Sequence, residues 1–281
     1  MKVKLIQMTQ NPIDVMWTAA RTCYSAKSPI EMWEDKYSEV SDECEHTCEW
    51  IEQCTEKHWK LVKQVLNSGH ASIAEHVYLT FTIEGISRAC SHQLVRHRAG
   101  IVFSQQSQRY VEIKERYEKI RDLVVSIDPL CEYFNECTCE KEEQELIEIL
   151  NKYFVDVNED NAIGYGQALM HYLRKTDWGE KAEDARNFLP NATKTNITMS
   201  INLRELMHVS NLRLCTRAQL EICQLFQAIK KEVEAQDERL ASLLVPSCEV
   251  YGFCTEHQCC GRKPKLEEVL EGYERYKDLN K

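Results

Sequence analysis

Segments with helical and strand-like patterns alternate irregularly along this chain. The helical patterns cover residues 12–23, 57–67, 86–97, 142–155, 162–174, 203–213 and about 218–244. The strand-like patterns cover residues 3–8, 76–83, 101–113 and 193–201. A regular series of β-α-β units would alternate far more evenly, so the order of these segments predicts an α+β fold.

Glycine is scarce, with nine residues in a chain of 281. The sequence contains neither a G-x-G-x-x-G string nor a G-x-x-x-x-G-K-[ST] string. These strings form the backbone cradles that hold phosphates in dinucleotide-binding Rossmann domains and in P-loop proteins. The sequence therefore argues against both fold classes and predicts that side chains hold any phosphate that this protein binds.

The charge balance limits the classes of partner. The formal net charge is -10, and nine of these charges fall in the acidic segment 31–56, so broad, non-specific binding of nucleic acid is not expected. No run of about 18 apolar residues occurs, and the N-terminal residues lack the pattern of a secretory signal. We therefore expect a cytoplasmic protein that does not enter a membrane.

Fourteen cysteines without a secretory signal favour thiols or metal ligands over a disulfide framework. Most of them form three groups: Cys44, Cys48 and Cys54; Cys131, Cys137 and Cys139; and Cys248, Cys254, Cys259 and Cys260. None has the paired C-x2-C spacing of structural zinc sites, so we expect reduced thiols and no metal. A zinc-binding structural or interaction protein is the alternative, most plausible at the last group, and a metal assay on the purified protein distinguishes the two.

A first polar cluster lies between Gln93 and Tyr110. On a helix, Gln93, Arg96 and His97 would share one face. On a strand that follows, Gln105, Ser107 and Arg109 would point to one side, with Gln106, Gln108 and Tyr110 on the other. An amide, a hydroxyl and a guanidinium in one row suit an oxyanion, although any single arginine here is explained as well by pairing with an acidic residue.

A second polar cluster runs from Asn202 to Arg217. Arg204, His208 and Asn211 lie at positions i, i+4 and i+7 and would line one stripe of a helix. Arg213 lies nine positions after Arg204, about half a turn away, so this helix would serve two sites or two molecules in one site.

The order of these segments resembles the flavin-dependent thymidylate synthase (ThyX) family. The resemblance is carried, from Arg21 to Ile222, by Arg21-Thr22-Cys23-Tyr24, Gly69-His70-x-Ser72-x-x-Glu75-His76, Ser87-Arg88-x-x-x-His92-Gln93, Arg96-His97-Arg98, Ser107-Gln108-Arg109-Tyr110, Arg186-x-x-Leu189-Pro190, Asn202-x-Arg204 and Leu212-Arg213-x4-Ala218-Gln219-x-Glu221-Ile222. Eight residues separate Arg98 from Ser107, where seven are commonest in the family, so either Gln105 or Gln106 fills the position that an acidic or amide residue often holds in the family.

The resemblance implies a mainly antiparallel sheet covered by helices, with active sites at the subunit interfaces of a homotetramer. It implies an enzyme that methylates dUMP to dTMP, taking carbon from 5,10-methylenetetrahydrofolate and reducing equivalents from NADPH through FAD. The residues implied to bind FAD are Ser72, Glu75, Arg96, His97, Arg98, Gln105, Asn202, Arg204 and His208. Those implied to bind dUMP are Gln93, Arg96, Gln105, Gln106, Ser107, Gln108, Arg109, Arg186 and Arg213, with Arg213 as the catalytic residue at the uracil edge.

We expect one synthase-like domain over residues 1–263, with acidic, cysteine-bearing inserts near 31–56 and 131–145 and a charged tail at 264–281. Ser107 is expected to bind rather than attack, because a nucleophilic serine needs an adjacent base and His97 is implied to serve the flavin. A nucleotide-binding module without catalysis is a further alternative, which retains the arginines but not the turnover.

Overall fold

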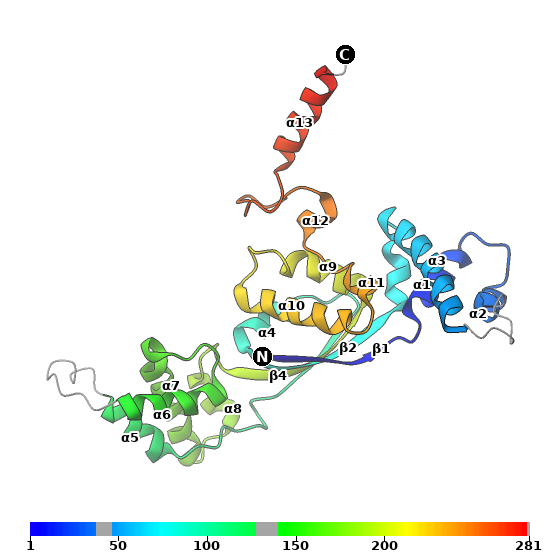
Figure 1. Cartoon of the computed structure of the whole chain (residues 1–281). Coiled ribbons are helices and arrows are strands. Elements are labelled where there is room, and N and C mark those ends of the chain that lie inside the picture. Colours follow the sequence, from blue (N-terminus) through cyan, green and yellow to red (C-terminus); the bar gives the residue numbers. More distant parts are fainter. Residues whose placement is uncertain (38–46, 128–139, 280–281) are drawn as a thin grey trace. The chain divides into compact units, whose positions relative to one another are not determined.

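The computed structural model describes residues 1–37, 47–127 and 140–279 (Figure 1). The helices are α1 (Pro12–Thr22), α2 (Pro29–Glu34), α3 (Thr47–Asn67), α4 (Arg88–Leu94), α5 (Tyr117–Ser126), α6 (Glu140–Tyr153), α7 (Glu159–Asp177), α8 (Ala182–Ala185), α9 (Leu203–Arg213), α10 (Leu220–Glu234), α11 (Glu238–Ala241), α12 (Ser247–Tyr251) and α13 (Leu266–Leu279). Short 3-10 helices are η1 (Asp35–Tyr37), η2 (Ala71–His76) and η4 (Arg186–Phe188). No helix in the described ranges is long and apolar enough to span a membrane.

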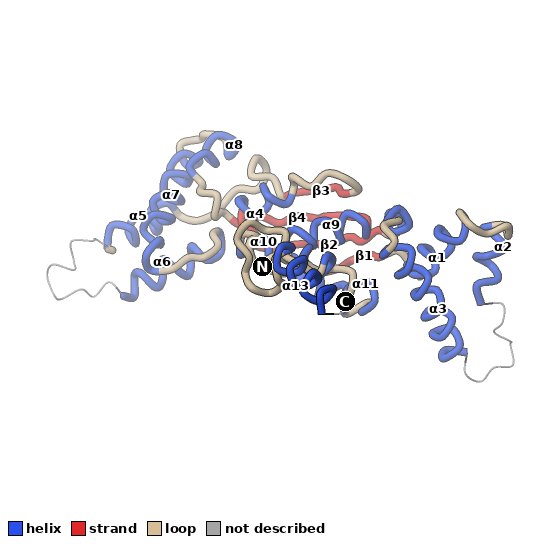
Figure 2. Tube along the Cα trace, turned by 90° about the horizontal axis from the view of Figure 1, so that it is seen from above, coloured by secondary structure: helices blue, strands red, loops and turns tan. Residues whose placement is uncertain are grey.

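Four strands form one antiparallel sheet, in the order β1 (Lys2–Met8), β2 (Tyr78–Ser87), β4 (Lys194–Asn202) and β3 (Ile101–Gln105) (Figure 2). Along β2, the side chains of Leu79, Phe81 and Ile83 are buried and alternate with more exposed neighbours. This period of two is the one expected for a strand with one face on a core. The predicted α+β class and the antiparallel sheet are confirmed.

By its internal contacts, the chain divides into two compact units. Unit 1 comprises residues 1–2, 83–96 and 104–198, and unit 2 comprises residues 3–82, 97–103 and 199–281. In unit 1, α5, α6 and α7 pack on one another and α8 packs on α7, as the green helices in Figure 1 show. Ile120, Leu146, Leu169 and Tyr172 are almost fully buried between them. The amphipathic patterns of 142–155 and 162–174 predicted two of these helices.

In unit 2, α1 packs on α3, and η2 packs on both α1 and α9. The α1–α3 contact includes a buried hydrogen bond of 2.8 Å between His58 Nδ1 and an Asp14 carboxylate oxygen. Helix α3 ends at Asn67, and Gly69 follows with a φ of 87°, the left-handed conformation in which glycine often ends a helix. Helices α9 and α10 also pack on each other, and α9 begins directly after β4.

Three predicted helix boundaries are wrong. The helix expected over 86–97 is only Arg88–Leu94, because β2 continues to Ser87, whose hydroxyl accepts the Cys90 N–H and caps α4. The helix expected over 218–244 is interrupted, since the Asp237 carboxylate accepts the N–H groups of Arg239 and Leu240 and starts α11. The helix expected to begin at Lys57 begins at Thr47.

The strand predicted over 101–113 is also wrong beyond Gln105. From Ser107 the chain turns, and the backbone carbonyl of Ser107 accepts the N–H of Val111 at 3.0 Å. Alternating polar residues satisfy the strand pattern, but their backbone groups bond locally instead of extending the ladder. The predicted row of Gln105, Ser107 and Arg109 on one strand face therefore does not exist. Arg96 and His97 likewise lie beyond α4, so they share no helical face with Gln93.

Candidate active site

Asn202, one of the residues implied to bind FAD, is the N-cap of α9 in unit 2. Its side-chain oxygen accepts the Glu205 N–H at 2.8 Å and caps α9, while its own N–H donates to the Gly100 carbonyl at 2.8 Å. Gly100 has a φ of 60°, and a Cβ built on it would lie 2.0 Å from Asn202 Nδ2. The loop after the Arg96-His97-Arg98 segment therefore depends on glycine for its close approach to the start of α9.

Arg204 and Glu75 connect α9 to η2. The Arg204 guanidinium forms an ion pair with the Glu75 carboxylate, and both side chains are about half exposed. Ser72, on the same short helix as Glu75, is exposed as well. Arg204, Glu75 and Ser72 thus expose a guanidinium, a carboxylate and a hydroxyl to solvent. A guanidinium can bind a phosphate, and a carboxylate can accept hydrogen bonds from ligand hydroxyl groups.

Arg213, at the end of α9, donates from Nε to His97 Nε2 at 3.2 Å. The other ring nitrogen of His97, Nδ1, lies 4.0 Å from Oε1 of Glu205. The substrate-assigned Arg213 and the cofactor-assigned His97 are therefore direct neighbours, although 116 residues separate them in the sequence.

Burial shifts the pKa values of this cluster. Desolvation, with smaller contributions from the positive charges of Arg213 and His208, lowers the pKa of His97 to about 4. Burial raises the pKa of Glu205, although His208 and Arg204 oppose that shift. At neutral pH His97 is therefore uncharged, which is the form that can accept a hydrogen bond from Arg213.

The lowered pKa of His97 predicts acid sensitivity. The ordinary pKa of histidine is 6.5, so between about pH 6.5 and 4 His97 is protonated in the unfolded chain and stays neutral in the folded protein. The free energy of unfolding should be highest above 6.5 and fall across this window by on the order of 1–2 kcal/mol, solvent screening included. Urea unfolding at pH 7 and pH 5 tests this. The His97→Gln variant should lose less stability than the wild type, and equal losses would contradict the assignment.

The substrate-assigned segment 105–109 belongs to unit 1. Gln105 Nε2 donates to the hydroxyls of Ser91 at 2.9 Å and Thr195 at 3.2 Å, so this amide is held by α4 and β4. Gln106 instead accepts a hydrogen bond from Asn196 Nδ2 at 3.1 Å, and its residue is exposed. Of the two glutamines, Gln106 is thus the one open to a ligand.

Two predicted substrate-binding arginines of unit 1, Arg109 and Arg186, both contact Glu183. Arg109 Nε donates to Glu183 Oε2 at 2.7 Å, and Arg186 Nε donates to the Glu183 carbonyl at 3.0 Å. Arg88 lies close enough to Arg186 for its positive charge to contribute, after burial, to a lowered pKa of Arg88. Three guanidinium groups near one turn create a local positive site on an acidic protein.

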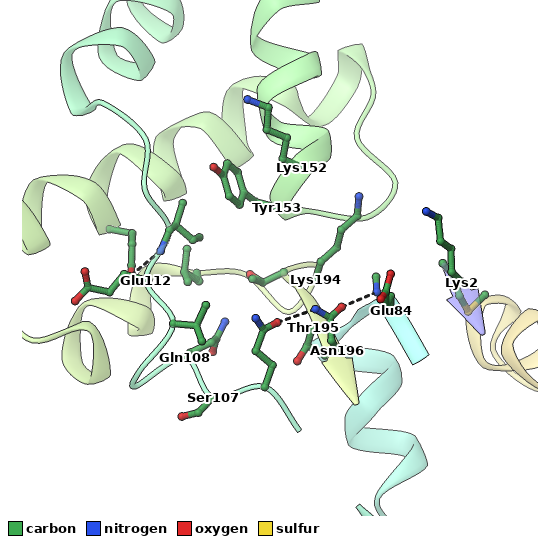
Figure 3. A pocket seen from close by; sticks show the side chains of 18 residues that line it. Lys2, Glu84, Ser107, Gln108, Glu112, Lys152, Tyr153, Lys194, Thr195 and Asn196 are labelled. Atoms are coloured by element: carbon green, nitrogen blue, oxygen red, sulfur yellow. Dashed lines mark hydrogen bonds between the residues drawn. The ribbon is translucent and has the colours of Figure 1, made fainter. Parts of the chain in front are cut away.

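Unit 1 contains a cavity of about 400 Å³ (Figure 3). Gln106, Ser107 and Gln108 line it, together with residues that include Tyr153 and Lys194. Arg109 and Arg186 are not among the residues that line this cavity. The predicted binding segment therefore divides into a face toward the cavity and a face toward the arginines.

The remaining predicted residues are placed as follows. Gln93 lies on α4, Arg96 and Arg98 are exposed in the loop after it, and His208 is exposed on α9. Sequence reasoning missed Glu183, Asn196 and Glu205, which hold predicted residues in place. Of these three, Glu205 carried a signal, because it stands three residues after the helix-capping Asn202.

The comparisons with known proteins decide the family. The model of the thymidylate synthase complementing protein family matches residues 4–237. A flavin-dependent thymidylate synthase from Pyrococcus furiosus is 33% identical over 280 residues, covering 96% of this chain and 98% of the relative. The chain belongs to the flavin-dependent thymidylate synthase family. A second member, from Clostridium tetani, is 33% identical and covers 95% of this chain and 96% of its own length.

Solved structures share the fold of this synthase. A ThyX crystal structure from Helicobacter pylori, complexed with FAD and dUMP, aligns with a TM-score of 0.61 at 24% identity, covering 87% of this chain and 100% of that one. The UMP/dUMP methylase PolB from Streptomyces cacaoi, bound with 5-Br dUMP, aligns with a TM-score of 0.55 at 20% identity, covering 86% and 93%. Both likenesses establish a common architecture.

The three cysteine groups contain none of the predicted site residues. Cys44 and the whole group at 131–139 lie outside the described residues, and nothing is described of the Cys48 side chain. The described cysteines, including Cys54 and the group from Cys248 to Cys260, are free thiols. Within the described ranges, no three His, Cys, Asp or Glu side chains are arranged to hold a metal ion.

Proposed function

We propose that this protein methylates dUMP to dTMP, with 5,10-methylenetetrahydrofolate as carbon donor and NADPH-reduced FAD as reductant. Membership of the family carries this proposal. The described residues support it, because both units present arginine side chains that can bind phosphate. The sequence contains no glycine-rich phosphate-binding string.

The unit 2 residues fit a flavin dinucleotide. Arg98 and Arg204 offer exposed guanidinium groups to a diphosphate, and Glu75 offers an acceptor to hydroxyl groups. The loop at Gly100 leaves no room for a side chain where it meets Asn202. When bound, FAD supplies the redox chemistry that none of these side chains can perform. The proposed set also includes Ser72, His97 and His208 of unit 2, together with Arg96 and Gln105 of unit 1.

The unit 1 residues fit a nucleoside monophosphate. Ser107 and Arg109 suit the phosphate, with Arg186, Gln93, Arg96, Gln106 and Gln108 as further contacts. We assign Arg213 to the uracil edge, where its permanent positive charge stabilises negative charge that develops on the ring as C5 becomes nucleophilic. Its Nε is engaged by His97, which leaves the terminal nitrogens of the guanidinium for the ring.

We further propose that the working form is a cytoplasmic homotetramer with active sites at its subunit interfaces. Arg204 and Arg213 stand at opposite ends of α9 and have different partners, Glu75 and His97. One helix can thus contribute to two sites when copies of the chain assemble. Size-exclusion chromatography with light scattering, with and without dUMP, tests the assembly.

Colour and turnover test the function. The purified protein should be yellow, and NADPH should bleach it in the absence of oxygen. Addition of dUMP and methylenetetrahydrofolate should then yield dTMP. Protein that stays colourless after incubation with FAD would contradict the function, whereas yellow protein that binds dUMP without forming dTMP would support a nucleotide-binding module.

Replacement of Arg109 tests the phosphate site. Arg109→Ala removes a guanidinium that Glu183 holds at 2.7 Å, so we expect KM for dUMP to rise about 10- to 100-fold with a smaller change in kcat. Arg121→Ala is the control, because that exposed arginine of unit 1 forms its ion pair with its neighbour Asp122 and has no proposed part in the site. An unchanged KM in Arg109→Ala would remove this arginine from the substrate site.

A further inference from the structure

The carboxylate of Glu205 has no role yet in the proposed site. Glu205 stands in the first turn of α9 and is 9% exposed. A glutamate three residues after a helix cap often bonds back to the N–H of the capping residue. Here the Asn202 N–H already donates to the Gly100 carbonyl at 2.8 Å. The Glu205 carboxylate is thereby released from capping, and a buried carboxylate requires another partner.

That partner is His97. Oε1 of Glu205 lies 4.0 Å from Nδ1 of His97, and the side chains of both residues are about nine-tenths buried. At 4.0 Å the contact is electrostatic, and it becomes a hydrogen bond with a movement of about 1 Å. The positive charges of His208 and Arg213 help to lower the pKa of the His97 ring, and Glu205 is an acidic side chain beside its Nδ1.

The hydrogen bond from Arg213 fixes the tautomer of His97. Arg213 Nε can only donate, so His97 Nε2 must present its lone pair. The single proton of the neutral ring is then on Nδ1, the nitrogen that faces Glu205. A carboxylate at this position stabilises the Nδ1–H form and holds the ring in one orientation.

We propose that Glu205 is a positioning residue, which acts through the imidazole of His97 to hold the Arg213 guanidinium at the uracil edge of dUMP. This inference rests on the proposed function. It assigns a task to a side chain outside the sets that we propose to bind substrate and cofactor. The Glu205 carboxylate orients the His97 imidazole, and the imidazole orients the Arg213 guanidinium. In this proposal only the guanidinium contacts the substrate.

Kinetics of Glu205→Leu and Glu205→Gln test the proposal. Leucine fills the space without charge, so kcat should fall about 10- to 100-fold while bound flavin and KM for dUMP stay within about twofold of the wild type. Glutamine keeps an acceptor oxygen and should restore part of kcat. Glu234→Gln, an exposed position on α10, is the matched control and should match the wild type. An unchanged kcat in Glu205→Leu overturns the proposal.

A double-variant comparison separates positioning from general stability. Arg213→Lys removes the Nε donor. In this background, adding Glu205→Leu should lower the single-turnover rate by less than about twofold relative to Arg213→Lys alone. Effects that multiply instead would show that Glu205 acts independently of Arg213 and would overturn the proposal. Loss of flavin from Glu205→Leu together with a lowered Tm would do the same, since it indicates a purely structural role.

The tautomer of His97 tests the role of Glu205 without depending on enzyme activity. NMR of protein labelled at histidine should report the Nδ1–H form of His97 in the wild type. In Glu205→Leu the ring should turn away from Arg213, lose that hydrogen bond and shift toward the Nε2–H form. If the wild type forms no dTMP, the proposed function fails, and the tautomer still decides whether Glu205 orients His97. An identical tautomer in both proteins contradicts the positioning role.

Discussion

Arg213→Ala is expected to lower dTMP formation by about 10³-fold while the purified variant remains yellow. The guanidinium is the only group that we assign to developing charge on the pyrimidine, so its loss should affect kcat directly. Flavin binding should survive, because the proposed flavin contacts at Arg204, Glu75 and Asn202 have partners other than Arg213. Anaerobic assays with NADPH, dUMP and methylenetetrahydrofolate measure the first effect, and the visible spectrum measures the second.

The control for this variant is Arg217→Ala. Arg217 is an exposed arginine four residues further along the chain, and we give it no part in the site. It should retain wild-type turnover. NADPH oxidation by Arg213→Ala without dTMP formation would separate flavin reduction from methyl transfer. Retained dTMP synthesis in Arg213→Ala would refute its catalytic role and, with it, the positioning role of Glu205.

Helix α9 shows how much of the fold the sequence determines locally. Its predicted range, 203–213, is exactly the observed one, because Asn202 caps its start and the strand pattern of 193–201 ends just before it. Residues 218–244 have an equally good helical pattern, yet the helix breaks where Asp237 caps a new turn. A capping residue inside a periodic pattern is ambiguous until packing selects one conformation.

The candidate site was predictable by residue type and not by geometry. Arginines, amides and a histidine in two short segments indicated anion binding, and the family resemblance supplied their roles. The partners of these residues come from distant segments, as Arg109 with Glu183 and Arg213 with His97 show. Periodicity carries no information on such pairs. The turn at Ser107 was mistaken for a strand because alternating polar residues fit both conformations.

Gly100→Ala is expected to lower both the stability and the flavin content of the protein. Its φ of 60° is strained for alanine, and the new Cβ would lie 2.0 Å from Asn202 Nδ2. To relieve this contact, either the cap of α9 or the loop after Arg98 must move. We expect a loss of about 2–4 kcal/mol in unfolding free energy and weaker flavin binding.

Gly179→Ala separates the two causes of this loss. Gly179 has a φ of 86°, but a Cβ there meets no atom within 4 Å, so this variant carries the backbone strain alone. It should cost about 1 kcal/mol and leave flavin binding unchanged. Urea unfolding gives the free energies, and flavin titration of the folded apoproteins gives the affinities. If both variants lose equal stability and both bind flavin normally, the contact between Gly100 and Asn202 does not shape the cofactor site, and the flavin must be held elsewhere.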